Sequence, residues 1–155
     1  MKYVVGLDSF DSMANFKALS LEHWESFNNP PPAFKEEFLK TLQLITAKTG
    51  NTTVGYLFFA VFNSPYHDER WCQTDMYYLS TKHRKQGIGK QMFDLLEETA
   101  KSQGCSKIMS SHNVKQSLDS FYTTRGYVAT HFVVAKEIWY ARNRTTNIRR
   151  VLYSR

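Results

Sequence analysis

The residues with the most evident chemistry form a short basic run, Arg84-Lys85-Gln86-Gly87-Ile88-Gly89-Lys90. The run follows an apolar, strand-like stretch that ends at Leu79, and an amphipathic helix begins within it near Ile88. A glycine-containing turn that opens a helix presents several backbone N–H groups and the positive end of the helix dipole to an anion. The run therefore predicts a phosphate-binding loop.

Two other glycine-rich phosphate loops have a different spacing. The Walker loop requires Gly, four residues and then Gly-Lys-Ser/Thr, whereas Arg84 stands at the first position here and Gln91 follows Lys90. The dinucleotide fingerprint requires a third glycine where this chain has Met92. Neither loop accounts for the run.

The run resembles the Arg/Gln-x-x-Gly-x-Gly/Ala pyrophosphate loop of the GNAT superfamily, the acetyl-CoA-dependent N-acyltransferases. A second run, Phe121-Tyr122-Thr123-Thr124-Arg125-Gly126-Tyr127, is similar to the aromatic-Tyr-x-x-x-Gly-aromatic signature of that family, and the two runs occur in the family's order. The resemblance implies one N-acetyltransferase domain over residues 1–138 and a basic extension over residues 139–155. The chain resembles small phage-encoded members of the family, and a phage-encoded protein is expected in the cytoplasm of a bacterial host.

The composition is that of one packed domain: 155 residues, of which 42% are hydrophobic and 15% aromatic, with a net charge of +6. Two cysteines, Cys72 and Cys105, are too few for a disulfide scaffold, and the N-terminus has no signal-peptide pattern. No apolar stretch approaches the roughly 20 residues that cross a bilayer. These features predict a cytoplasmic protein with reduced thiols and no membrane contact.

Apolar periodicity predicts one continuous series of strands and helices. Strands are expected over residues 2–7, 44–47, 54–62, 71–79, 107–111 and 127–135, and helices from residue 12, over 33–42, from 88 to 104 and over 115–124. This order matches the GNAT fold, an α/β (α+β) architecture. The resemblance implies a mixed, mostly antiparallel sheet of six to seven strands, splayed at the acetyl-CoA site and flanked by about four helices. A last strand is expected near residues 148–153.

The resemblance also implies a cofactor site for acetyl-CoA (coenzyme A). In the family, backbone groups at the end of the fourth strand meet the thioester and the pantetheine arm, and loop amides hold the pyrophosphate. The implied contacts here are Tyr77, Tyr78, Leu79, Arg84, Lys85, Gln86, Gly87, Ile88, Gly89, Lys90, Asn113, Phe121 and Tyr122. Asn113 has an alternative role as the cap of the following helix.

Acyl transfer to an amine requires a base for the amine and a proton for the leaving thiolate. Tyr122 matches the family tyrosine that acts as general acid, with a packed core ring as its alternative role. Asp75 is the best-placed carboxylate for the base, because it lies two residues before Tyr77 and is expected on the same strand face. His23, His67 and His112 are alternative bases. No residue cluster has the spacing of a metal site.

The sequence thus predicts transfer of an acetyl group from acetyl-CoA to a primary amine of a small molecule or protein, by direct attack in a ternary complex. Residues 136–155 carry six basic residues against the single acid Glu137, so modification of a nucleobase amine is a second hypothesis. A non-catalytic inhibitor or interaction module of the same fold is the third. The chain is expected to be a monomer or a homodimer.

Overall fold

The computed structural model describes residues 2–28, 32–112 and 118–130. The chain divides into two compact units, residues 1–117 and 118–155, and each is described here by itself. Asn113, the predicted boundary at residue 138 and the basic extension lie outside the described residues.

The first unit is built on a five-stranded sheet in the order β1-β2-β3-β4-β5. The strands are β1 (Tyr3–Asp8), β2 (Gln43–Thr49), β3 (Thr52–Asn63), β4 (Arg70–Leu79) and β5 (Cys105–Met109). The first three neighbouring pairs are antiparallel, and β4 and β5 are parallel. The mixed, mostly antiparallel sheet confirms the predicted fold class, although five strands are described where six or seven were expected.

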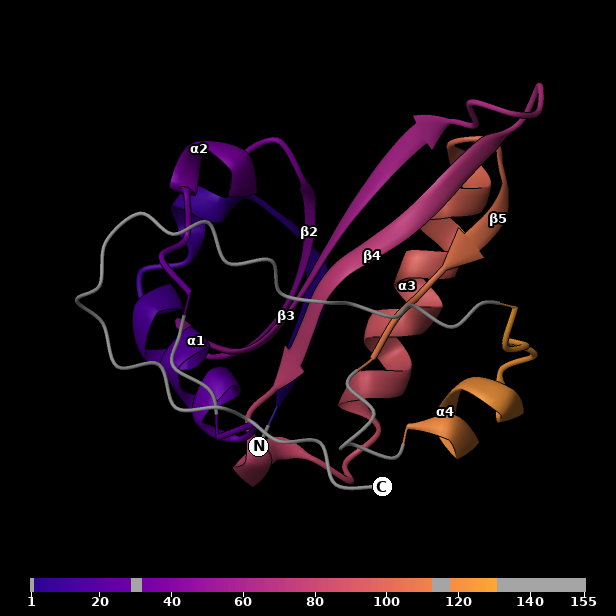
Figure 1. Ribbon diagram of the computed structural model, residues 1–155. Helices are drawn as coiled ribbons and strands as arrows, with labels where there is room; N and C mark the ends of the chain where they lie inside the picture. Colours follow the sequence, from indigo (N-terminus) through magenta and orange to yellow (C-terminus); the bar gives the residue numbers. More distant parts are fainter. Residues whose placement is uncertain (1, 29–31, 113–117, 131–155) are drawn as a thin grey trace, which may run out of the picture. The chain divides into compact units, whose positions relative to one another are not determined.

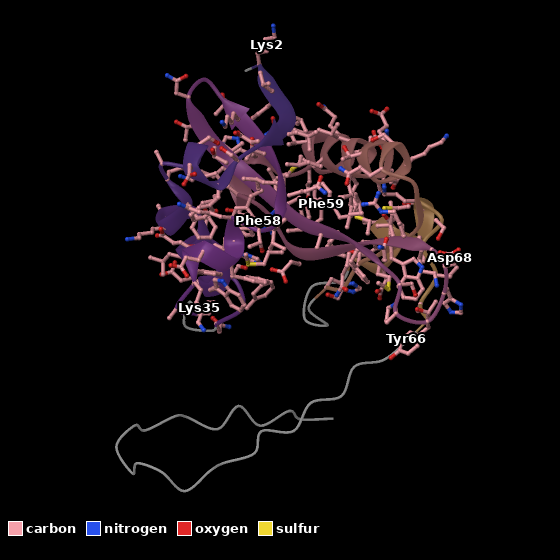
Figure 2. The ribbon with its side chains drawn as sticks, turned by 90° about the horizontal axis from the view of Figure 1, so that it is seen from above. Lys2, Lys35, Phe58, Phe59, Tyr66 and Asp68 are labelled. Atoms are coloured by element: carbon pink, nitrogen blue, oxygen red, sulfur yellow. The ribbon has the colours of Figure 1, made fainter. Side chains whose placement is uncertain are left out.

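The central strand β3 is buried on both sides, and helices cover both faces of the sheet (Figure 1). Figure 2 shows Phe58 and Phe59, adjacent in β3, pointing to opposite faces. Phe58 joins a core with residues of α1 (Phe16–Glu25) and α2 (Glu36–Leu39). The other face packs against α3 (Ile88–Ser102), which buries a regular apolar stripe. A strand between two layers of helices must be apolar on both faces, as the sequence predicted.

Several predicted boundaries were wrong by a few residues. The helix expected from residue 12 is a 3-10 turn, η1 (Phe10–Ser12), followed by α1. The helix predicted over 33–42 is the single turn α2, because the chain turns at residues 41 and 42 and Gln43 already pairs with Phe59 in the sheet.

The second unit contains one described helix, α4 (Asp119–Thr124). It ends at Thr124, and Gly126, two residues later, has a left-handed φ of 82°, which is typical of the residue just after a helix. Residues 127–130 have irregular backbone instead of the predicted strand, and the rest of that strand lies outside the described residues.

Pairing between the two parallel strands covers only the first part of β4. It stops at Gln73 and Met109, where β5 ends, so residues 74–79 are not paired with β5. Just beyond this point a hydrogen bond of 2.8 Å joins the hydroxyls of Thr74 and Ser110. The β4–β5 pairing therefore ends before the last part of β4, where the resemblance implies the splay.

Candidate functional site

The loop between β4 and α3 contains the predicted phosphate site. After β4 the chain forms a second 3-10 turn, η2 (Thr81–His83), and then Lys85 and Gly87 take left-handed φ angles of 60° and 76°. Gly87 is the N-cap of α3 and, as a glycine, has no side chain that could cap this end of the helix. The first N–H groups of α3 have no partner within the helix, so this end is suited to an anion.

Exposed positive charges surround this helix end. Lys82, Arg84, Lys85 and Lys90 are all exposed, as is Gln86, whereas Ile88 is buried beneath the helix. Lys90 pairs with Asp94 one turn later at 2.7 Å. The loop thus combines backbone donors with positive charge, as the sequence predicted for phosphate binding.

Two side chains from distant elements hold the loop in place. Glu22 of α1 accepts hydrogen bonds from the Ser80 hydroxyl at 2.9 Å and from the Thr81 backbone N–H at 3.2 Å. Burial opposes ionisation of Glu22, but these donors outweigh it and lower the pKa of the carboxyl. From β1, the hydroxyl of Tyr3 donates to Gln86 Oε1 at 3.0 Å. Sequence reasoning assigned no role to Tyr3 or Glu22, because no local pattern indicates contacts 58 to 83 residues away.

Arg84 is turned back toward β4. Its Nε donates to the Leu79 carbonyl at 2.9 Å, and its guanidinium lies 5.4 Å from the centre of the Tyr78 ring. Tyr78 is buried, and burial together with the nearby Glu22 carboxylate raises its pKa to about 12. The Leu79 carbonyl, one of the backbone groups predicted to meet the cofactor, therefore already has a donor.

Tyr77 lies on the opposite face of the sheet from Tyr78. Its ring packs edge-on against Phe93 of α3 at 5.1 Å between ring centres. Its hydroxyl reaches the first turn of α3, where a Cβ on Gly89 would lie only 2.5 Å from the hydroxyl oxygen. The second glycine of the loop is thus required here by a neighbouring side chain.

His23 lies in a buried aromatic cluster. Its Nδ1 is 2.7 Å from the Tyr56 hydroxyl, and its ring stacks on Tyr78 at 4.6 Å between centres and 20° between planes. Burial, aided by the charge of Arg84, lowers the pKa of His23 to about 4. The imidazole is therefore neutral at pH 7 and a weak base.

Asp75 occupies a β-bulge. Phe58 pairs with Met76 and Phe59 with Thr74, so Asp75 is the extra residue of β4. Thr74 pairs with Phe59 and Tyr77 pairs with Leu57, so Thr74 and Tyr77 share one face although they are three residues apart. The strict alternation from which Asp75 was expected on the face of Tyr77 is therefore interrupted at Asp75 itself. The residue is exposed, yet partial burial of its carboxyl raises the pKa of Asp75.

The remaining predicted residues belong to other segments of the chain. Phe121 and Tyr122 belong to α4 in the second unit, where the buried Tyr122 packs edge-on against Tyr127 at 5.4 Å between ring centres. His67 is exposed in the loop before β4 and His112 is half-buried after β5.

Two kinds of feature are absent from the part of the chain that the structure describes. It contains no group of three or more His, Cys, Asp or Glu side chains placed to hold a metal ion. None of its helices combines the length and the apolar character needed to span a bilayer.

The fold and the loop together define an α/β protein with a mixed sheet and a glycine-containing basic loop at the N-terminus of its amphipathic helix α3. The chain belongs to the acetyltransferase (GNAT) family, whose family model matches residues 12–127. Members of this family use acetyl-CoA as the acetyl donor. No curated protein gives a significant match to the sequence.

Solved structures with the same fold include three that cover nearly the whole chain. A ribosomal-protein-alanine N-acetyltransferase from Brucella melitensis biovar Abortus 2308 is 20% identical, with 88% of this chain and 100% of that chain covered and a TM-score of 0.71. A transcriptional regulator from Bacillus halodurans C-125 is 17% identical, with the same coverage and a TM-score of 0.73. An aminoglycoside acetyltransferase from an uncultured soil metagenomic sample, in complex with trehalose, is 17% identical, with 91% and 97% covered and a TM-score of 0.69. At these identities the likeness is one of fold.

Proposed function

We propose that this protein is an acetyl-CoA-dependent N-acetyltransferase that acts on a primary amine of a small molecule or protein by direct attack in a ternary complex. The observation that carries the proposal is the N-terminus of α3, where the glycine loop of Lys85 and Gly87 follows the part of β4 that is not paired with β5. The helix end suits a pyrophosphate, and we assign the amides of a pantetheine arm to the last part of β4.

The reaction forms a bond between the amine nitrogen and the acetyl carbon and breaks the carbon–sulfur bond of the thioester. We assign the developing oxyanion to backbone N–H groups at the end of β4, where Tyr77 and Tyr78 lie. We assign the proton of the amine to Asp75, whose raised pKa makes its carboxylate a better base than an ordinary aspartate. Tyr122 is assigned the proton for the thiolate, on the resemblance of its run to the family signature.

We do not assign His23 to proton transfer. Its Nδ1 is engaged by Tyr56, and a pKa of about 4 leaves the imidazole too weak a base for an amine at pH 7. We propose instead that His23 packs α1 against β3 and β4.

The proposal is tested by the melting temperature with and without acetyl-CoA. At 100 times its Kd, a ligand that binds only the folded state stabilises it by about 2.7 kcal/mol. For a domain of this size that corresponds to a rise of roughly 5–10 °C. The Gly87→Ala variant is expected to lose this rise, because a side chain disfavours the left-handed φ of the loop.

Gly104→Ala is the matched control. Gly104 has a φ of 77° against 76° for Gly87, and an added Cβ meets no atom within 4 Å at either position. Both variants should therefore lose a similar amount of stability, about 1–2 kcal/mol, but only Gly104→Ala should keep the full response to acetyl-CoA. The absence of any shift in the wild-type protein would contradict the proposed function.

A further inference from the structure

We infer that Arg84 is a positioning residue, which shapes the phosphate loop through its contacts with β4 and does not act as a direct ligand of the phosphate. The inference deepens the proposed function. The part of it that concerns cofactor binding rests on that function. It departs from the sequence-based prediction that Arg84 contacts acetyl-CoA.

The first observation is the closure of the turn between β4 and the loop. At the start of the turn, Ser80 N–H donates to the Val54 carbonyl and His83 N–H to the Ser80 carbonyl, both at 2.9 Å. The last backbone bond, from Arg84 N–H to the Thr81 carbonyl, is long at 3.4 Å. The side chain of Arg84 closes the turn with a shorter hydrogen bond, because its Nε donates to the Leu79 carbonyl at 2.9 Å. A hydrogen bond from a charged donor is stronger than one between neutral groups.

The second observation is the anchoring of the guanidinium on the core. It lies over the ring of Tyr78, which is 3% exposed and stacks on His23. His23 in turn contacts the Tyr56 hydroxyl on β3. An arginine held by both a carbonyl and an aromatic face has a defined direction. The loop that begins at Arg84 is therefore attached to β3, β4 and α1 through this side chain.

The third observation is that positive charge at the loop does not depend on Arg84. Lys82 and Lys85 flank it, and both are exposed. The ε-ammonium of lysine is a compact, hydrated charge that lacks the planar guanidinium and its Nε donor. Replacing Arg84 by lysine therefore keeps the charge but removes the planar guanidinium and the Nε donor to the Leu79 carbonyl, which separates the two roles.

The experiment compares wild type, Arg84→Lys, Arg84→Gln and the control Lys85→Gln. Hydrogen exchange of the ligand-free proteins is followed for amides 79–87 and for the β2–β3 hairpin, residues 48–53. Affinity for CoA is measured by calorimetry. We expect both Arg84 variants to exchange faster at residues 79–87 with an unchanged hairpin, and both to bind CoA about tenfold more weakly. Lys85→Gln should leave exchange at residues 79–87 at the wild-type rate.

Two results would overturn the inference. One is wild-type exchange at residues 79–87 in both Arg84 variants. The other is wild-type CoA affinity in Arg84→Lys together with a loss in Arg84→Gln, since affinity would then depend on the positive charge at position 84 and not on the guanidinium contacts with β4. If the wild-type protein does not bind CoA, the proposed function fails, and the exchange rates of the ligand-free variants alone decide the role of Arg84.

Discussion

Replacing Gly89 by alanine should destabilise this protein, although alanine is the better helix former. Gly89 is the second residue of α3, and its φ is not in the left-handed region, so the backbone itself accepts alanine. The obstacle is the Tyr77 hydroxyl, which would lie 2.5 Å from the new Cβ. Tyr77 cannot easily move away, because its ring is packed against Phe93.

The size of the effect follows from two opposing terms. Forcing an extra methyl group into a packed site costs about 1–3 kcal/mol. The gain in helix propensity from glycine to alanine is at most about 1 kcal/mol. The net loss in the wild-type background should therefore be about 1–2 kcal/mol. In a Tyr77→Phe background the nearest atom is the ring Cζ at 3.8 Å, an ordinary contact, so the same substitution should become neutral or slightly stabilising.

The assay is urea unfolding of the four proteins of the double-mutant cycle, with a coupling energy of about 1–3 kcal/mol expected. Gly55→Ala provides the control, since its added Cβ would meet Leu79 Cδ1 at 2.9 Å and the Tyr78 carbonyl oxygen at 3.0 Å. Its cost should be the same with either residue at position 77. The reasoning would be refuted if Gly89→Ala changed stability equally in the wild-type and Tyr77→Phe backgrounds.

Two further predictions concern buried polar groups in the first unit. Since His23 has a folded pKa of about 4, below the ordinary value of 6.5, its neutral form is favoured by folding. The stability from this group is complete above pH 6.5 and is lost as the pH falls toward 4, by up to about 3 kcal/mol. Urea unfolding between pH 7 and 4 should show a flatter profile for His23→Gln, whereas a profile as steep as wild type would contradict the assignment. Asp8→Asn should lower the free energy of unfolding by about 1–3 kcal/mol, because the half-buried carboxylate accepts hydrogen bonds from Lys48, Ser12, Thr46 and the Ser9 N–H. The control Asp11→Asn breaks an exposed pair with Lys40 and should cost less than about 1 kcal/mol by the same assay. Equal costs of the two substitutions would contradict this reasoning.

The sequence predicted those parts of the fold that depend on short-range pattern. The apolar run of β3, the hairpin it forms with β2 and the stripe of α3 all follow from residues within one segment. The loop was also predictable, because the glycine at position 87 and the helix that follows it are local signals. The likeness of these runs to a known family then implied a mixed, mostly antiparallel sheet.

The sequence by itself therefore determined the sheet elements, the amphipathic helix and the place of the glycine-containing basic loop before it. Only the tertiary structure decided where the side chains of the site point. The bulge at Asp75 interrupts an alternation that the sequence leaves unbroken, and Arg84 turns back to Leu79 although its neighbours suggest a phosphate ligand. Glu22 and Tyr3 reach the loop from elements far away in the chain. Such contacts depend on strand register and on the packing of whole elements, and neither is encoded in the spacing of nearby residues.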